Sequence, residues 1–281
     1  DIIRRLTAQF GMTFLIIDGY HFTASWFDEL FLKVLKSSVS NTIPNASPVR
    51  LVLIDDDMTT PMQYAHLLFN PSPYVEEEDY YRHLKLTEGS EYPKILVGEQ
   101  FTLLRPEFFY CNREKEGEKL LLTFGGSDPL NLSMTIIEIL EQELSPFIPC
   151  LLITGPGYQH AKNLKKIVKE SFLDIEHFHA VDDMLPFYQG SRLAISAAGS
   201  TVYELAATCT PSVLLVVAEN QRQVATSISN AGWAVSINML KTDNLPDLCA
   251  ANQLLKLAVH QINSWWNDSE ELDKRRAFLN R

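Results

Sequence analysis

The chain has 281 residues, of which 46% are hydrophobic and 21% charged, a composition typical of a globular protein with a packed core. Its formal net charge is −11 and its pI is about 5.1. This acidity argues against nucleic-acid binding, because such binding depends on neutralising phosphates with Lys and Arg.

The length favours two medium α/β domains. The four cysteines lie far apart without a Cys-x-x-Cys pair, which predicts reduced thiols and no zinc site or disulfide framework. No apolar run approaches the roughly 20 residues of a membrane span, and the N-terminus lacks the pattern of a signal peptide. We therefore expect a cytoplasmic protein without a membrane span, and the sequence carries no mark of its oligomeric state.

In the first part of the chain, short apolar runs alternate with longer stretches, which is typical of a parallel sheet covered by helices. The polar run 112–119, after Arg105 and Pro106, is typical of a domain crossover, so we expect domains 1–114 and 115–281. The predicted strands of the first domain are 13–17, 51–54, 67–69 and 95–97, with a helix at 24–35.

The second part repeats the strand and helix alternation more regularly and predicts a complete doubly wound, Rossmann-like domain. The first domain is short of strands by comparison, and we expect an incomplete Rossmann-like domain there. In the second domain, the predicted strands are 120–124, 150–154, 175–179, 193–196, 213–217 and 234–237. The predicted helices are 132–144, 161–170, 184–189, 202–209 and 221–231, followed by one or two helices in 248–280.

The first candidate for ligand binding is the turn Gly125-Gly126-Ser127-Asp128, which leads from a predicted strand into a helix. Paired glycines let a ligand approach the backbone, and free amides at a helix start favour an anion. These residues therefore predict a phosphate site. The alternative is a tight turn in which Ser127 or Asp128 caps the helix.

A second candidate contains Gly199-Ser200-Thr201 after the predicted strand 193–196, with Glu204 one turn into the next helix. Small residues would let a ligand lie against this turn, and the Glu204 carboxylate can accept hydrogen bonds from a ribose diol. In a capping box, Ser200 or Thr201 would instead bond the helix start. Both roles are open at this stage.

A third polar turn, Glu219-Asn220-Gln221, follows the predicted strand 213–217. Ligands of open α/β sheets bind outside the carboxyl ends of the strands. We therefore expect the three turns to converge on one crevice.

Polar residues also follow strands in the first domain. Asp18, Tyr20 and His21 could supply acid, base or orienting groups, with an exposed loop capped by Asp18 as the alternative. The acidic run 55–57 lacks partner carboxylates elsewhere, so a solvated strand end or a substrate-facing carboxylate is favoured over a metal site. We expect no metal and no cofactor.

Taken in order, four motifs carry a family resemblance: Ile16-Ile17-Asp18-Gly19-Tyr20, Phe124-Gly125-Gly126-Ser127-Asp128, Ala197-Ala198-Gly199-Ser200-Thr201-Val202-Tyr203-Glu204 and Glu219-Asn220-Gln221. They resemble the UDP-2,4-diacetamido-2,4,6-trideoxy-β-L-altropyranose hydrolases of pseudaminic acid biosynthesis and their spore-coat polysaccharide relatives. The resemblance implies a GT-B-like architecture and metal-independent hydrolysis of the anomeric C–O bond of a UDP-sugar, with inversion.

The resemblance also assigns roles to residues. Gly126 and Ser127 would lie near the diphosphate, Ser200 and Thr201 near phosphate or ribose, and Glu204 would hold the ribose. The implied catalytic residues are Tyr20, Asp18 and Asn220. The implied UDP-binding residues are Gly125, Gly126, Ser127, Gly199, Ser200, Thr201, Glu204, Asn220 and Gln221.

One departure from the family pattern concerns the chemistry. The family carries a Gly-x-Gly-His-x-x-Arg motif with its catalytic His in an early loop, and this sequence contains nothing of that form. We expect the chain as it stands to bind UDP better than it hydrolyses UDP-sugars. The alternatives are a GT-B glycosyltransferase, which passes the sugar to an acceptor, and a non-catalytic UDP-sugar-binding module.

Overall fold

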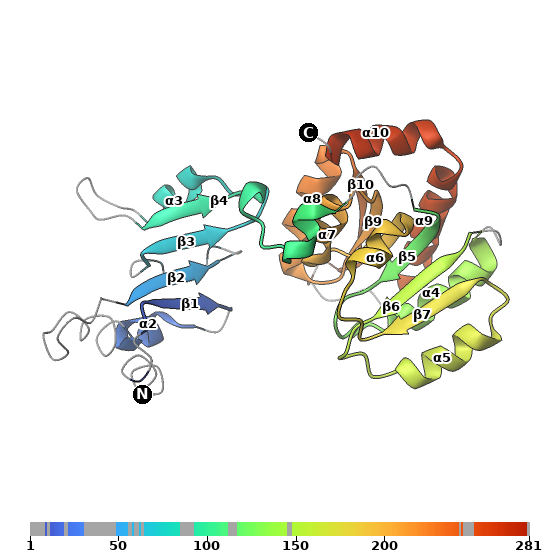
Figure 1. Cartoon of the computed structure of the whole chain (residues 1–281), viewed down its shortest axis with the longest axis horizontal. Helices are drawn as coiled ribbons and strands as arrows, with labels where there is room; N and C mark the ends of the chain where they lie inside the picture. The colour runs from blue at the N-terminus through green and yellow to red at the C-terminus, as the bar shows by residue number, and fades with distance from the viewer. Residues whose placement is uncertain are drawn as a thin grey trace, which may run out of the picture. The chain divides into compact units, whose positions relative to one another are not determined.

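The computed structural model divides into two compact units, residues 1–103 and 104–281 (Figure 1). The expected domain boundary between residues 114 and 115 lies outside the described residues. The segment that begins with Leu104 packs with the second unit, because Phe108 is buried in one of its cores. The structure describes residues 9, 12–19, 22–30, 49–55, 58, 62, 65–84, 93–111, 117–144, 148–241, 243 and 250–279.

Within the described residues, the first unit holds a parallel sheet, as the sequence predicts, and its strand order is β1-β2-β3-β4. Its core contains Phe27, Leu51, Leu53, Leu68 and Tyr80. The strands are β1 (Phe14–Asp18), β2 (Arg50–Ile54), β3 (Leu67–Asn70) and β4 (Lys94–Val97), and the helices are α2 (Ala24–Leu30), α3 (Glu77–Leu84) and the 3-10 helix η2 (Glu99–Phe101). Residues 31–35 of the expected helix 24–35 lie outside the described part.

In the second unit, the described residues form a parallel sheet in the order β10-β9-β8-β5-β6-β7. The prediction of a doubly wound domain is confirmed. Its strands are β5 (Lys119–Thr123), β6 (Cys150–Thr154), β7 (Ile175–His179), β8 (Ser191–Ala197), β9 (Ser212–Val216) and β10 (Ala234–Asn238). Its helices are η3 (Pro106–Tyr110), α4 (Leu132–Glu143), α5 (Ala161–Glu170), α6 (Leu185–Gln189), α7 (Thr201–Ala207), η4 (Glu219–Gln221), α8 (Arg222–Ala231), α9 (Ala251–Trp266) and α10 (Ser269–Leu279).

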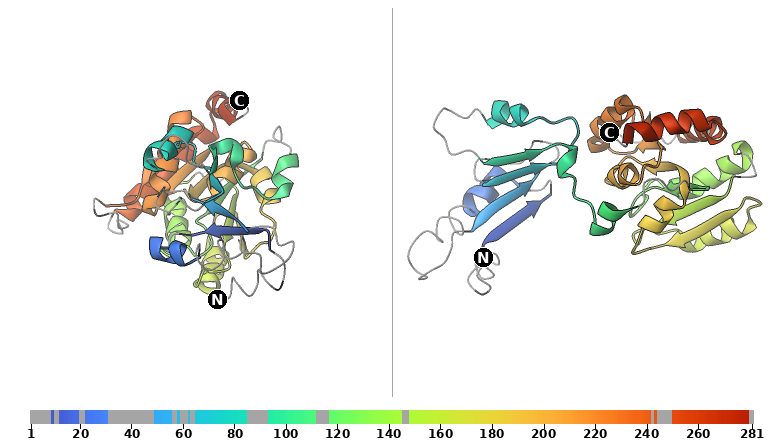
Figure 2. Two further views of the ribbon diagram at one scale, coloured as in Figure 1. Left: turned by 90° about the vertical axis from the view of Figure 1, so that its left-hand side faces the viewer. Right: turned by 45° about the horizontal axis from the view of Figure 1, so that its top comes forward.

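Both faces of this second sheet are covered, which explains why its strands are continuous apolar runs. Successive residues of a strand point to opposite faces, so Leu120 and Leu122 enter one core while Leu121 enters the other. The first core is closed by α4, α5 and α9, and the second by η3, α6, α7 and α8 (Figures 1 and 2).

The C-terminal helices pack back onto the sheet. Trp265 is buried in the core, and the Arg275 guanidinium lies 3.8 Å from the centre of its ring. Arg275 also donates to the Gly232 carbonyl at 3.0 Å, which ties α10 to the end of α8. None of the helices that the structure describes is long and apolar enough to cross a bilayer.

Candidate functional site

The strand order of the second unit contains a topological switch point between β5 and β8. The chain leaves β5 toward β6 on one side, whereas it leaves β8 toward β9 on the other. Neighbouring connections that diverge in this way open a crevice at the carboxyl ends of the strands, where ligands of doubly wound sheets bind. Two of the three predicted ligand turns follow these two strands.

The turn after β5 presents bare backbone. Gly125 and Gly126 are exposed, and a Cβ at either position would meet no described atom within 4 Å. Beneath them, Gly157 N donates to Gly126 O at 2.9 Å, and a Cβ on Gly155 would lie 2.4 Å from Gly126. The turn after β6 therefore packs against one side of the turn after β5, and the other side of the turn after β5 is open.

The start of α4 is already capped, which corrects part of the sequence interpretation. The two carboxylate oxygens of the buried Asp128 accept hydrogen bonds from Leu132 N at 2.9 Å and Ser133 N at 2.8 Å. The local alternative is thus confirmed for Asp128, and these two amides are not open to a phosphate. An anion here would depend on the turn residues Gly125, Gly126 and Ser127, all exposed.

The turn after β8 differs, because among the described residues its Ser200 side chain does not cap the helix that follows. Ser200 is exposed at the start of α7, and within the described chain its side chain makes no capping hydrogen bond. The Glu204 carboxylate binds Arg105 and Tyr188. The capping box is therefore not formed, and the Ser200 hydroxyl is left at the surface of the turn.

The turns after β8 and β9 lie against each other. Gln221 Oε1 accepts a hydrogen bond from Val217 N at 3.0 Å, and its Nε2 lies 3.8 Å from the place of a Cβ on Gly199. Asn220 precedes it on η4 and is exposed. Two of the three turns that were expected to converge thus approach each other, with Gln221 as the bridge.

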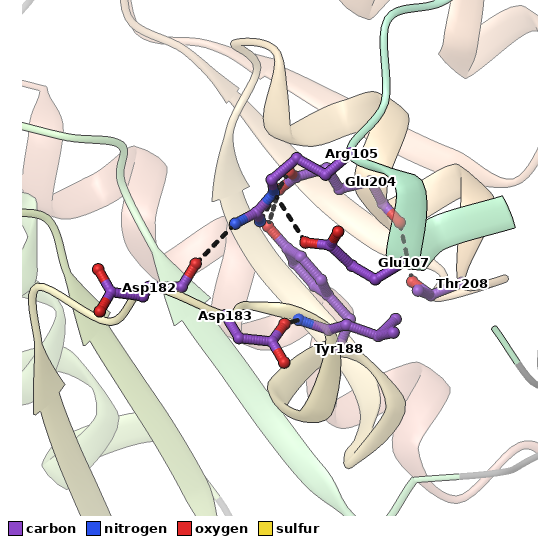
Figure 3. A network of polar contacts seen from close by, with 8 residues as sticks. Arg105, Glu107, Asp182, Asp183, Tyr188, Glu204 and Thr208 are labelled. Atoms are coloured by element: carbon purple, nitrogen blue, oxygen red, sulfur yellow. Dashed lines mark hydrogen bonds and ion pairs between the residues drawn. The ribbon is translucent and has the colours of Figure 1, made fainter. Parts of the chain in front are cut away.

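Glu204 lies at the centre of a polar network (Figure 3). Its Oε1 accepts a hydrogen bond from Arg105 Nη2 at 3.1 Å, and its Oε2 accepts one from Tyr188 Oη at 2.6 Å. Arg105 also donates to the Asp182 carbonyl at 2.8 Å and lies 3.4 Å from Glu107. Side chains of α6 and of the segment before η3 thus meet at the Glu204 carboxylate of α7.

Tyr188 is a permanent donor in this network. Burial raises the pKa of Tyr188 far above its ordinary value, and the charge of Glu204 and its hydrogen bond raise it further. A hydrogen bond with Thr201 and the charge of Arg105 act in the opposite direction on this pKa. Tyr188 therefore stays protonated and donates to Glu204 at every physiological pH.

Sequence reasoning missed both partners of Glu204. Tyr188 was expected only as part of a helix, and Arg105 only as part of a crossover. No local pattern could pair them with Glu204, because Arg105 precedes it by 99 positions. The one signal was that Arg105 is the single charged residue in the stretch 100–106.

The candidate residues of the first unit are only partly described. Asp18 ends β1 and is exposed, whereas Tyr20 and His21 lie outside the described residues, as do Asp56 and Asp57. Asp55 is buried and accepts a hydrogen bond from Tyr80 at 2.8 Å. The interpretation of this strand end as a solvated or substrate-facing carboxylate is therefore wrong for Asp55.

Among the described residues, no three His, Cys, Asp or Glu side chains gather in a way that could hold a metal ion. His177 and His179 instead share the hydroxyl of the buried Thr154, at 2.9 and 3.1 Å.

Residues 120–258 match the family model of the glycosyltransferase family 28 C-terminal domain. A curated relative from Methanocaldococcus jannaschii, the uncharacterized protein MJ1062, is 26% identical over 183 residues, which cover 62% of this chain and 37% of that protein. The chain thus spans little more than a third of the length of this relative.

Solved structures share the fold at low sequence identity. Acinetobacter baumannii MurG is 13% identical with a TM-score of 0.57, over 98% of this chain and 71% of MurG. The pneumococcal O-GlcNAc transferase GtfA, solved with UDP and GlcNAc, is 11% identical with a TM-score of 0.58, over 99% and 56% of the two chains. The spinosyn rhamnosyltransferase SpnG, complexed with thymidine diphosphate, is 13% identical with a TM-score of 0.56, over 98% and 71%. The chain therefore has a GT-B glycosyltransferase-like fold, and its residues 120–258 match the C-terminal domain of glycosyltransferase family 28.

Proposed function

We propose that this protein processes a nucleotide-sugar and binds the UDP part in its second unit. The observation that carries the proposal is the pair of open turns at the switch point between β5 and β8, inside a domain that matches glycosyltransferase family 28. The neighbour GtfA, whose structure contains UDP and GlcNAc, has the same fold.

The accessible groups suit the parts of UDP. The backbone of Gly125, Gly126 and Ser127 is open on its outer side and would receive the diphosphate, since amides of a glycine turn favour anions. Ser200 and Thr201 would contact phosphate or ribose. Glu204 would accept hydrogen bonds from the ribose hydroxyls, because each of its oxygens keeps a further lone pair beyond the contact that it already makes.

Gly199 would allow close approach of the ligand, and Asn220 and Gln221 would contact the diphosphate and sugar. The position of Gln221 against Gly199 supports this assignment, because it places an amide group beside the turn that would hold the ribose.

The reaction that we propose first is hydrolysis at the anomeric carbon. The oxygen of a water molecule bonds to that carbon while the bond from the carbon to the UDP oxygen breaks, and UDP leaves with the electron pair. The proton of the water passes to the carboxylate of Asp18, the proposed base, whereas Tyr20 and Asn220 are proposed as orienting groups. The exposure of Asp18 at the end of β1 is consistent with such a role.

Transfer of the sugar to an acceptor is the second candidate, and the match to a glycosyltransferase domain specifically favours it. A third candidate is a UDP-sugar-binding module without catalysis. Release of UDP from UDP-GlcNAc and related UDP-sugars, measured with and without candidate acceptors, separates these three. Release without acceptor indicates hydrolysis, release only with acceptor indicates transfer, and binding without release indicates the module.

Calorimetric titration with UDP tests the binding site that all three share. We expect micromolar affinity, about −8 kcal/mol, weakened at least tenfold by Glu204→Gln, which removes the negative charge but keeps the size of the side chain. Glu138→Gln, on an exposed position of α4, is the matched control and should bind as the wild type does. Absence of UDP binding by the wild type would refute the nucleotide-sugar proposal.

A further inference from the structure

The Glu204 carboxylate is held from both sides by donors that are themselves fixed. Tyr188 is 1% exposed and packs against Phe108, with ring centres 5.9 Å apart. Arg105 lies over the same Phe108 ring, with its guanidinium carbon 5.5 Å from the ring centre. One aromatic side chain of η3 thus supports both donors.

Arg105 is restrained by further contacts on other elements. Its Nη1 donates to the carbonyl of Asp182, in the segment between β7 and α6, and its Nε lies 3.4 Å from Glu107. A planar guanidinium with several occupied donors has little freedom to reorient. Its remaining nitrogen therefore reaches Glu204 from one fixed direction.

The two donors leave part of the carboxylate open. Arg105 occupies one position on Oε1 and Tyr188 one position on Oε2, out of about four acceptor positions on an ionised carboxylate. The Glu204 side chain is 20% exposed, so it is not sealed in the core. One acceptor position on each oxygen matches two hydroxyls on neighbouring carbons, as in a ribose.

We propose that Arg105 and Tyr188 are positioning residues, which hold the Glu204 carboxylate in one orientation so that it recognises both hydroxyls of a ribonucleoside diphosphate. This inference rests on the proposed function and extends it from the binding of UDP to recognition of its two ribose hydroxyls. Neither residue would touch the nucleotide. Each would act through Glu204, because preorganised acceptors bind a diol better than mobile ones.

The test compares two ligands, UDP and 2′,3′-dideoxyuridine diphosphate, which lacks the two hydroxyls. Calorimetry measures both with the wild type, Tyr188→Phe, Arg105→Gln and Arg105→Lys. We expect Tyr188→Phe and Arg105→Gln to weaken UDP about tenfold and to leave the affinity for the dideoxy ligand unchanged. Arg105→Lys keeps the charge and should recover part of the loss.

Tyr110→Phe is the matched control for the tyrosine, because this residue of η3 is 90% exposed. Thermal unfolding verifies that each variant is folded. If a variant at Arg105 or Tyr188 does not fold, the variant at the other position still tests the proposal. A merely structural role of Arg105 and Tyr188 would weaken both ligands equally, and this outcome overturns the proposal while the UDP site stands. Tighter UDP binding in either variant would also overturn it, since the contacts would then compete with the ribose. A wild type that binds neither ligand refutes the proposed function and this inference together.

Discussion

Both units place polar residues or glycines where strands end, but the neighbours of these residues differ. In the first unit, Asp55 follows β2 and Asn70 ends β3, and both bind the hydroxyl of Tyr80 and are at most 1% exposed. In the second unit, Gly125, Gly126 and Ser200 lie at the same kind of position and are open on their outer sides. A polar residue or glycine after a strand therefore indicates a ligand site only where no neighbouring element already occupies its hydrogen-bonding groups.

The largest effect that we expect concerns the support of the glycine turn. Gly155→Ala would place a methyl group 2.4 Å from the Gly126 backbone, which cannot yield as a flexible side chain can. Overpacking of this kind should lower the free energy of unfolding by about 3 kcal/mol. Urea unfolding measures the loss, and UDP titration should show weaker binding, because the displaced turn is the proposed diphosphate site.

Gly126→Ala is the matched counterpart on the open side of the same contact. Its Cβ would meet no described atom, and its φ lies outside the left-handed region, so the free energy of unfolding should change by less than about 0.5 kcal/mol. UDP binding should nevertheless weaken at least tenfold, because the methyl group occupies the space of the ligand. A Gly126→Ala variant with normal UDP affinity would contradict the assignment of this turn to the diphosphate.

The next prediction concerns the buried, hydrogen-bonded cluster of Asp55, Asn70 and Tyr80 in the first unit. Tyr80→Phe removes the donor to Asp55 and the acceptor of Asn70 in a fully buried place, and should cost about 2 kcal/mol of stability. Urea unfolding measures the loss, and hydrogen exchange of residues 67–84 assigns it to the first unit. Tyr81→Phe, at the next and more exposed position of α3, should change stability by less than about 0.5 kcal/mol. Equal losses of stability in Tyr80→Phe and Tyr81→Phe would mean that the buried hydrogen bonds of Tyr80 contribute no more than an exposed hydroxyl. The contrast with the open turns of the second unit would then fail.

The same contrast explains what the sequence could predict. The strands of both units were predicted closely, because each is a short apolar run that ends in turn residues. The open turns of the second unit could also be found, since glycines and hydroxyls after a strand are local signals. The capping by Asp128 was one of two local options, and only the structure decided between them.

Contacts between distant segments could not be predicted in this way. Nothing near Asp55 in the sequence announces the Tyr80 hydroxyl, and nothing near Glu204 announces Arg105 or Tyr188. Such pairs arise from the order of strands and the crossing of helices, which fix side-chain neighbours only after folding.

The smallest expected effect concerns the hydrogen-bonded cluster of Thr154, His177 and His179 in the second unit, on β6 and β7. Burial, followed by the charges of His179 and Lys165, lowers the pKa of His177 below its ordinary value of 6.5. The folded protein then binds fewer protons here than the unfolded chain, so this contribution to stability is complete above 6.5 and is lost as the pH falls through 6.5 toward the lower folded value. His177→Gln can still hydrogen-bond Thr154 but cannot titrate, and should therefore flatten the fall of stability as the pH drops below about 6.5. Urea unfolding at several pH values measures the slope, with His83→Gln, at an exposed position of α3, as the control for the substitution itself. An unchanged slope in His177→Gln would mean that the cluster at Thr154 is as open to protons in the folded protein as in the unfolded chain, and that this strand end resembles the open turns rather than the buried cluster of Tyr80.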